Sequence, residues 1–131
     1  IFIFYCGNWS SSCLAQIDEL YKRSQELNDL NIVVNLISSQ SIELTKDLAL
    51  KYSIPFNFFV DHNGTIAEYL EIALKNGVPF GLVKKYGSDS LMPTLIVTNA
   101  QNTIVFTDQT NNYRVRPEPD VYLSILRRAR R

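Results

Sequence analysis

Short, uninterrupted apolar runs alternate along the chain with longer segments in which apolar residues recur every three or four positions. Residues 1–6 form the first run, and their β-branched and aromatic side chains are typical of a strand buried on both faces. The serines at 10–12 then offer N-cap hydroxyls to a helix whose apolar residues run from Leu14 to Leu27. Applied to the whole chain, these patterns predict strands at 1–6, 32–37 and 56–60, helices at about 11–27, 42–52 and 65–75, a strand pair at 95–98 and 103–107, and a last helix from Pro119.

The order of these elements indicates the fold. Each crossover helix returns the chain to the same end of the sheet, so the first three strands must be parallel, and the later strand pair adds antiparallel strands. We therefore predict an α/β fold, a three-layer sandwich with a mixed central sheet, as a single domain over residues 1–131. Because the sequence lacks an initial Met and ends inside a helical pattern, we expect this domain to be a fragment of a longer protein.

Charge and composition argue against several classes of function. Thirteen Lys and Arg residues balance thirteen Asp and Glu residues, so no net positive field attracts nucleic acid or an anionic membrane. The longest apolar run is much shorter than a membrane span. One histidine and two cysteines build neither a disulfide framework nor, unaided, a Cys/His zinc site. We expect a cytoplasmic protein without a metal or cofactor, and the sequence leaves its oligomeric state open.

Two local features predict reactive chemistry at the carboxyl ends of the parallel strands, where ligands collect in such sheets. Cys13 lies in the first turn of the expected helix, whose partial positive charge stabilises a thiolate and lowers the pKa of a thiol. Pro93 comes just before the strand at 95–98. Because proline cannot donate a ladder hydrogen bond, it belongs at the mouth of that strand, which makes Pro93 a candidate cis-proline.

Together these features resemble the thioredoxin fold, in which an aromatic-Cys-x-x-Cys segment faces a cis-proline followed by threonine. The longer match is to peroxiredoxin-like proteins of the alkyl hydroperoxide reductase and thiol-specific antioxidant family, whose pattern is Phe-Tyr-Arg-Gly-x-Trp-Cys-x-x-Cys. The segment that follows this pattern in register is Phe4-Tyr5-Cys6-Gly7-Asn8-Trp9-Ser10-Ser11-Ser12-Cys13. Further similarity at 48–55, 60–64 and 113–119 extends the resemblance over nearly the whole chain.

The resemblance implies a thiol-disulfide oxidoreductase or a thiol peroxidase. In such an enzyme position 10 is the attacking group, Cys13 is the resolving thiol, and Trp9 covers the site. The substrate is aligned by the backbone edge that Met92, Pro93 and Thr94 form. The implied partners are a protein thiol or disulfide, or a peroxide.

Ser10 departs from the family pattern, because it stands where the attacking cysteine is expected. A serine hydroxyl stays protonated near neutral pH and cannot cycle through a sulfenic acid or a disulfide. We therefore expect the two-cysteine cycle to be inactive or trapped in a protein with serine at position 10. Three interpretations stay open: an engineered replacement of cysteine by serine, a natural redox-inactive relative, or redox chemistry transferred to Cys6 and Cys13.

Two hypotheses on function follow from the sequence. The first is the peroxiredoxin-like oxidoreductase, and the alternative is a redox-dead thioredoxin-fold module that binds a partner or regulates a larger protein. His62 fits a solvated turn better than a catalytic base. Tyr113, Arg114 and Arg116 fit either a surface loop or a contact with a partner or anion, and the arginines at the end of the chain fit a solvated helix face.

Overall fold

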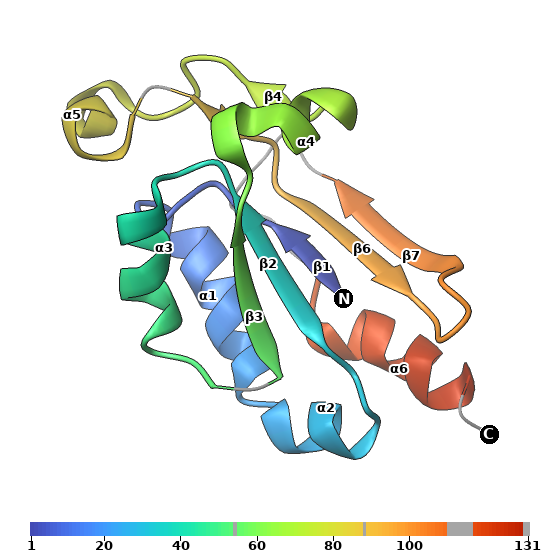
Figure 1. The fold of residues 1–131 in the computed structure, drawn as a ribbon. Coiled ribbons are helices and arrows are strands. Elements are labelled where there is room, and N and C mark those ends of the chain that lie inside the picture. Colours follow the sequence, from blue (N-terminus) through green and yellow to red (C-terminus); the bar gives the residue numbers. More distant parts are fainter. Residues whose placement is uncertain (54, 88, 110–116, 130–131) are drawn as a thin grey trace.

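The computed structural model describes residues 1–131 except 54, 88, 110–116 and 130–131. Its centre is a five-stranded mixed sheet in the order β3-β2-β1-β6-β7 (Figure 1). Strand β1 pairs in parallel with β2, β2 pairs in parallel with β3, and β6 pairs antiparallel with both β1 and β7. The strands are β1 (Phe2–Phe4), β2 (Val34–Ser38), β3 (Phe56–Val60), β6 (Thr94–Thr98) and β7 (Ile104–Gln109). The predicted parallel core with an antiparallel hairpin is thereby confirmed.

Two groups of elements cover the two faces of this sheet. The helices are α1 (Ser11–Tyr21), α2 (Ser24–Asp29), α3 (Ile42–Ala49), α4 (Thr65–Tyr69), α5 (Val83–Tyr86) and α6 (Pro119–Ala129), with 3-10 turns η1 (His62–Gly64) and η2 (Phe80–Leu82). Helices α1, α2, α3 and α6 supply the larger core on one face. A smaller core on the other face lies under α4 and a two-stranded sheet of β4 (Ala73–Leu74) and β5 (Ser90–Leu91).

Side chains alternate between these two cores along the central strands. Ile3 and Leu36 point into the larger core, whereas the next residues along their strands, Phe4 and Ile37, enter the smaller one. Because successive strand residues face opposite sides of a sheet, burial on both faces requires an almost continuous apolar run. This explains why the first two strands lack polar alternation.

The helix predicted over 11–27 is wrong in its continuity, because the chain breaks into α1 and α2. At Arg23 the backbone leaves the helical basin, with φ −98° and ψ 16°. The Arg23 guanidinium reaches Asp120 of α6 at 2.8 Å and Glu26 at 2.7 Å. Leu27 is fully buried in the larger core. The break thus lets Arg23 form an ion pair with α6 while Leu27 of α2 is still buried in the larger core.

The helix predicted over 65–75 is also too long, because α4 ends at Tyr69. Glu71 has a positive φ of 61°, a conformation that ends helices. Ile72 is then buried at 2% exposure in the smaller core, and Ala73 pairs with Leu91 across the β4–β5 ladder. The apolar spacing of this segment suits a helix, but the partner strand decides its structure.

The final helix buries only some of its apolar residues. Tyr122, Leu123 and Leu126 face the larger core, but Val121 is 49% exposed. Arg127 pairs with Glu26 of α2 and, at 3.1 Å, with Asp120. This arginine is therefore part of an interhelical ion-pair network, not of a purely solvated face.

We expect Asp61→Ala to lower the free energy of unfolding by about 2–3 kcal/mol, because it removes the acceptor of two amides in a buried setting. The Asp61 carboxylate is 2% exposed and accepts the N–H groups of Ile66 at 2.8 Å and Ala67 at 2.9 Å, so it caps α4. His62→Ala, in the same turn but exposed, should change stability by less than about 0.5 kcal/mol. Urea titrations of both variants measure the difference, and equal losses would contradict the capping role.

Candidate active site

The candidate site begins at the N-terminus of α1. Ser10 is the N-cap, with extended backbone angles of φ −92° and ψ 105°, and its Oγ accepts the Cys13 N–H at 3.3 Å. Serine is favoured there because its oxygen satisfies one of the amides that the helix leaves without a partner. Ser10 and Cys13 are 3% and 1% exposed. The structure therefore places both predicted residues together, buried in the first turn of the helix.

Cys6 connects this turn to the opposite wall of the site. Its backbone N–H donates to Cys13 Sγ at 3.4 Å, and its carbonyl accepts the Ser90 hydroxyl at 3.0 Å. Its own Sγ lies 3.7 Å from the Leu91 carbonyl oxygen, within reach of a weak S–H hydrogen bond. Cys6 and Cys13 are both reduced thiols. One residue, two positions beyond β1, thus contacts both the helix turn and β5.

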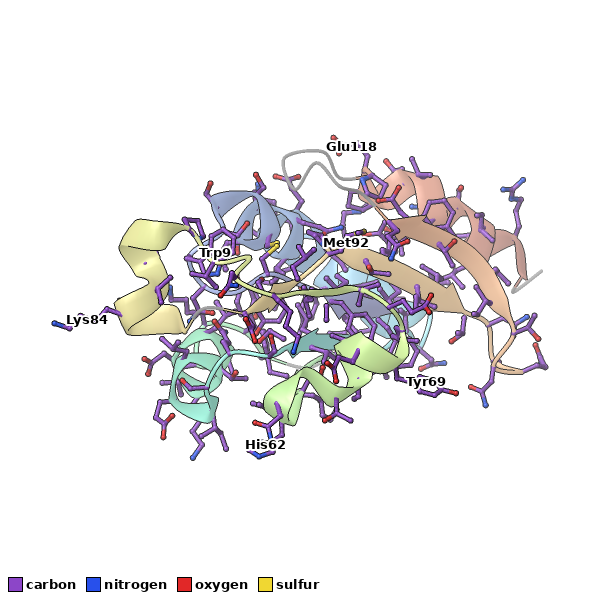
Figure 2. The ribbon with its side chains drawn as sticks, turned by 90° about the horizontal axis from the view of Figure 1, so that it is seen from above. Trp9, His62, Tyr69, Lys84, Met92 and Glu118 are labelled. Atoms are coloured by element: carbon purple, nitrogen blue, oxygen red, sulfur yellow. The ribbon has the colours of Figure 1, made fainter. Side chains whose placement is uncertain are left out.

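The segment after β5 carries the predicted substrate edge. Pro93 is buried immediately before β6, and Met92 is half-buried. The Thr94 hydroxyl donates to the Met92 carbonyl at 2.9 Å, and the Met92 N–H donates to the Ile72 carbonyl at 2.6 Å. In the view of Figure 2, Trp9 lies between Met92, near the middle of the molecule, and Lys84 of α5. The edge is therefore held by one backbone hydrogen bond to Ile72 and by one side-chain hydrogen bond within the edge itself.

A clamp of two amide side chains fixes the loop that leads into Ser10. Gln40 follows β2 and makes two hydrogen bonds with Asn8: its Oε1 accepts the Asn8 N–H at 2.9 Å, and its Nε2 donates to Asn8 Oδ1 at 2.7 Å. The Asn8 amide donates in turn to the Leu44 carbonyl at 2.8 Å. Sequence reasoning missed this clamp. The position of Gln40 just beyond a parallel strand is the signal that could have identified it.

Tyr5 closes the site from the side of the larger core. It is fully buried, and burial raises the pKa of its phenol above the ordinary value, although a hydrogen bond from Gln40 Nε2, 3.4 Å from its Oη, opposes that rise. The phenol therefore stays neutral near physiological pH. It contributes packing and a polar contact, not a charge.

Other candidate residues lie apart from this site. His62 is exposed in η1 and points outward beyond α4, well away from Trp9 (Figure 2). The proposed contact residues Tyr113, Arg114 and Arg116 lie outside the described residues. Within the described ranges, no three His, Cys, Asp or Glu side chains are grouped as a metal site would require.

A polar cavity of about 280 Å³ adjoins the site behind Ser90. Its other polar lining residues come from the segment after β2, from η1 and α4, and from the residues next to β4 and β5; they are Ser39, Asn63, Glu68, Lys75 and Asp89. Ser90 is the residue that the two regions share, because its hydroxyl also holds the Cys6 carbonyl. The reactive groups themselves lie on the Cys6 side of this residue.

Comparison with known proteins assigns the fold and the family. The model of the AhpC/TSA family matches residues 1–107. No sequence among curated proteins matches the chain significantly. Within the described part of the chain, no helix is long and apolar enough to cross a membrane.

Solved peroxiredoxin structures share the architecture at low sequence identity. Reduced Prx3 from Vibrio vulnificus superposes with a TM-score of 0.76 at 8% identity, over 96% of this chain and 79% of that one. AhpC from Enterococcus faecalis gives 0.70 at 16% identity, over 98% and 74%. The bacterioferritin comigratory protein of Xanthomonas campestris gives 0.68 at 11% identity, over 98% and 75%. The chain thus has the thioredoxin-like fold that these peroxiredoxins share.

We predict that Gly7→Ala displaces the indole of Trp9 and lowers stability by about 1–3 kcal/mol. Gly7 has φ +149°, and an added Cβ would lie 2.9 Å from Trp9 Nε1 and 3.1 Å from Gln40 Oε1. Trp9 is the sole tryptophan of the sequence, so the emission spectrum reports its surroundings directly. Gly81→Ala is the matched control, because its added Cβ meets no atom within 4 Å. An emission spectrum unchanged by Gly7→Ala would refute the close packing of this loop.

Proposed function

Because the chain belongs to the AhpC/TSA family, we propose that it is a peroxiredoxin-like thiol oxidoreductase domain in which Ser10 occupies the position of the attacking cysteine. The observation that carries this proposal is the place of Ser10 Oγ, which caps α1 directly over the Cys13 amide. A sulfur in that place would lie against helix N–H groups, which stabilise a thiolate. The site is therefore arranged for a thiolate but holds a hydroxyl.

This substitution stops the reaction before its first step. Peroxide reduction requires a thiolate that attacks the peroxide O–O bond and takes one oxygen as a sulfenic acid. The Ser10 hydroxyl has no comparable ionised form near neutral pH, and it cannot form a disulfide with Cys13. We therefore propose that the domain, with serine at position 10, performs no peroxidase or disulfide-reductase turnover through that position.

The surrounding residues support roles that would follow once position 10 held a thiol. Cys13 lies one turn into the helix and would resolve the oxidised sulfur. Trp9, next to Ser10, would cover the site. We propose that Pro93 has a cis peptide bond and that its edge, with Met92 and Thr94, aligns a peroxide or a protein thiol. The buried position of Pro93 at the start of β6 is consistent with this arrangement.

Ser10→Cys tests the proposal as a gain of function. With a dithiol reductant, we expect this variant to turn over hydrogen peroxide or insulin disulfides at least about tenfold faster than Ser11→Cys, because only position 10 combines the helix cap with the Cys13 partner. Ser11→Cys is the matched control, since it places a thiol on the same turn at an exposed residue. Peroxide consumption and insulin precipitation are the two measurements.

A second change separates turnover from initial oxidation. In the Ser10→Cys background, Cys13→Ser should abolish turnover while position 10 is still oxidised once by peroxide. Equal rates for Ser10→Cys and Ser11→Cys would contradict the proposal. No activity in a folded Ser10→Cys protein would instead favour a redox-dead domain that binds a partner.

A further inference from the structure

Cys6 and Cys13 form a second pair of thiols that does not involve position 10. The Cys6 amide nitrogen lies 3.4 Å from Cys13 Sγ. Because the N–Cα bond is about 1.5 Å long, the Cys6 Cα lies within about 5 Å of the Cys13 sulfur. Both residues belong to the larger core and are buried, Cys6 at 6% and Cys13 at 1% exposure. The fold therefore holds the two thiols as neighbours away from bulk solvent.

We infer that Cys6 and Cys13 become joined by an intramolecular disulfide when a small hydroperoxide oxidises the protein. The Cys6 side chain must turn from its present contact with the Leu91 carbonyl toward Cys13. That contact is a thiol hydrogen bond at 3.7 Å, which is weak and opposes the turn little. Gly7 follows Cys6 directly and can adjust the backbone more widely than other residues.

Cys13 is the thiol that reacts first. Its sulfur accepts the Cys6 N–H and lies in the first turn of the eleven-residue helix α1, and both surroundings stabilise negative charge on sulfur. The Cys6 thiol instead faces a carbonyl oxygen, which offers no such stabilisation. Cys13 is therefore the attacking thiol, and Cys6 is the resolving thiol.

The reaction balances with one equivalent of hydroperoxide. The Cys13 thiolate attacks the O–O bond, takes one oxygen as a sulfenic acid and releases the other as an alcohol, or as water from hydrogen peroxide. The Cys6 sulfur then attacks Cys13 Sγ, so that the S–S bond forms and the S–O bond breaks with loss of water. Two thiols and one hydroperoxide thus give a disulfide, an alcohol and water. Burial of both thiols favours a small oxidant over a folded protein disulfide.

Ser10 takes no covalent part in this reaction. Its hydroxyl only holds the Cys13 amide, so the inference goes beyond the proposed function and does not depend on it. Formation of the disulfide also ends the thiol contact between Cys6 and Leu91, two residues before Pro93. Oxidation would thereby release one of the contacts that hold the predicted substrate edge.

The test treats the unmodified chain with one equivalent of hydrogen peroxide, alkylates remaining thiols under denaturing conditions and digests with chymotrypsin. Cleavage after Trp9 separates Cys6 from Cys13, so the two peptides stay together only if a disulfide joins them. We expect both alkylation sites to be lost together and the intact mass to fall by two hydrogen atoms. Reduction before alkylation should restore both sites.

Two variants check the order of events. In Cys6→Ser, peroxide should leave a sulfenic acid on Cys13 that dimedone traps, whereas in Cys13→Ser the remaining thiol should stay largely unlabelled by dimedone. Three results with the unmodified chain would overturn the inference. They are alkylation of both thiols after peroxide treatment, a sulfinic acid on Cys13 beside an intact Cys6 thiol, and a disulfide between two chains. Any of these leaves the Ser10→Cys activity comparison unaffected, so the two proposals fail separately.

Discussion

The hydrogen bond from the Cys6 amide to the Cys13 sulfur is the contact on which the candidate site depends. It joins the segment just after β1 to the first turn of α1, and Cys6 also contacts Ser90 through its carbonyl and Leu91 through its thiol. Buried backbone N–H groups need an acceptor, and here the acceptor is a potential redox atom. Packing and chemistry are thus coupled at one sulfur, because a change in its oxidation state alters a hydrogen bond of the main chain.

The topology explains why this contact forms where it does. Parallel strands bring the chain ends of β1 and β2 to one edge of the sheet, so the loop after Phe4 meets the polar residues after Ser38. Gln40 fixes Asn8 with paired hydrogen bonds, and Ser10 then caps the helix. The loop between β1 and α1 is thereby held at Asn8 and at Ser10 before any ligand arrives. A site with a preorganised thiol position is the structural requirement for peroxide chemistry.

Local signals sufficed where the structure depends on local interactions. The run at 56–60 matches β3, and Ser10 and Cys13 occupy the helix turn that their spacing predicted. Local sequence patterns gave wrong predictions where a residue distant in the sequence determines the structure. The break at Arg23 involves Asp120, 97 residues away, and the helical pattern of 65–75 gives way to β4 only because Ser90–Leu91 supplies a partner strand. The Asn8–Gln40 clamp likewise joins residues 32 positions apart, so only the predicted order of the parallel strands, and not the sequence around either residue, could have identified it.

Amide hydrogen exchange of the reduced, unmodified chain tests most directly whether the loop between β1 and α1 is organised around the Cys13 sulfur. The Cys6 amide should exchange as slowly as the amides of the central strands, because its acceptor is buried and its opening requires the core to loosen. If the Cys6 amide instead exchanged as fast as an exposed turn amide such as that of Asn63, the sulfur would not hold the main chain and the account would be wrong.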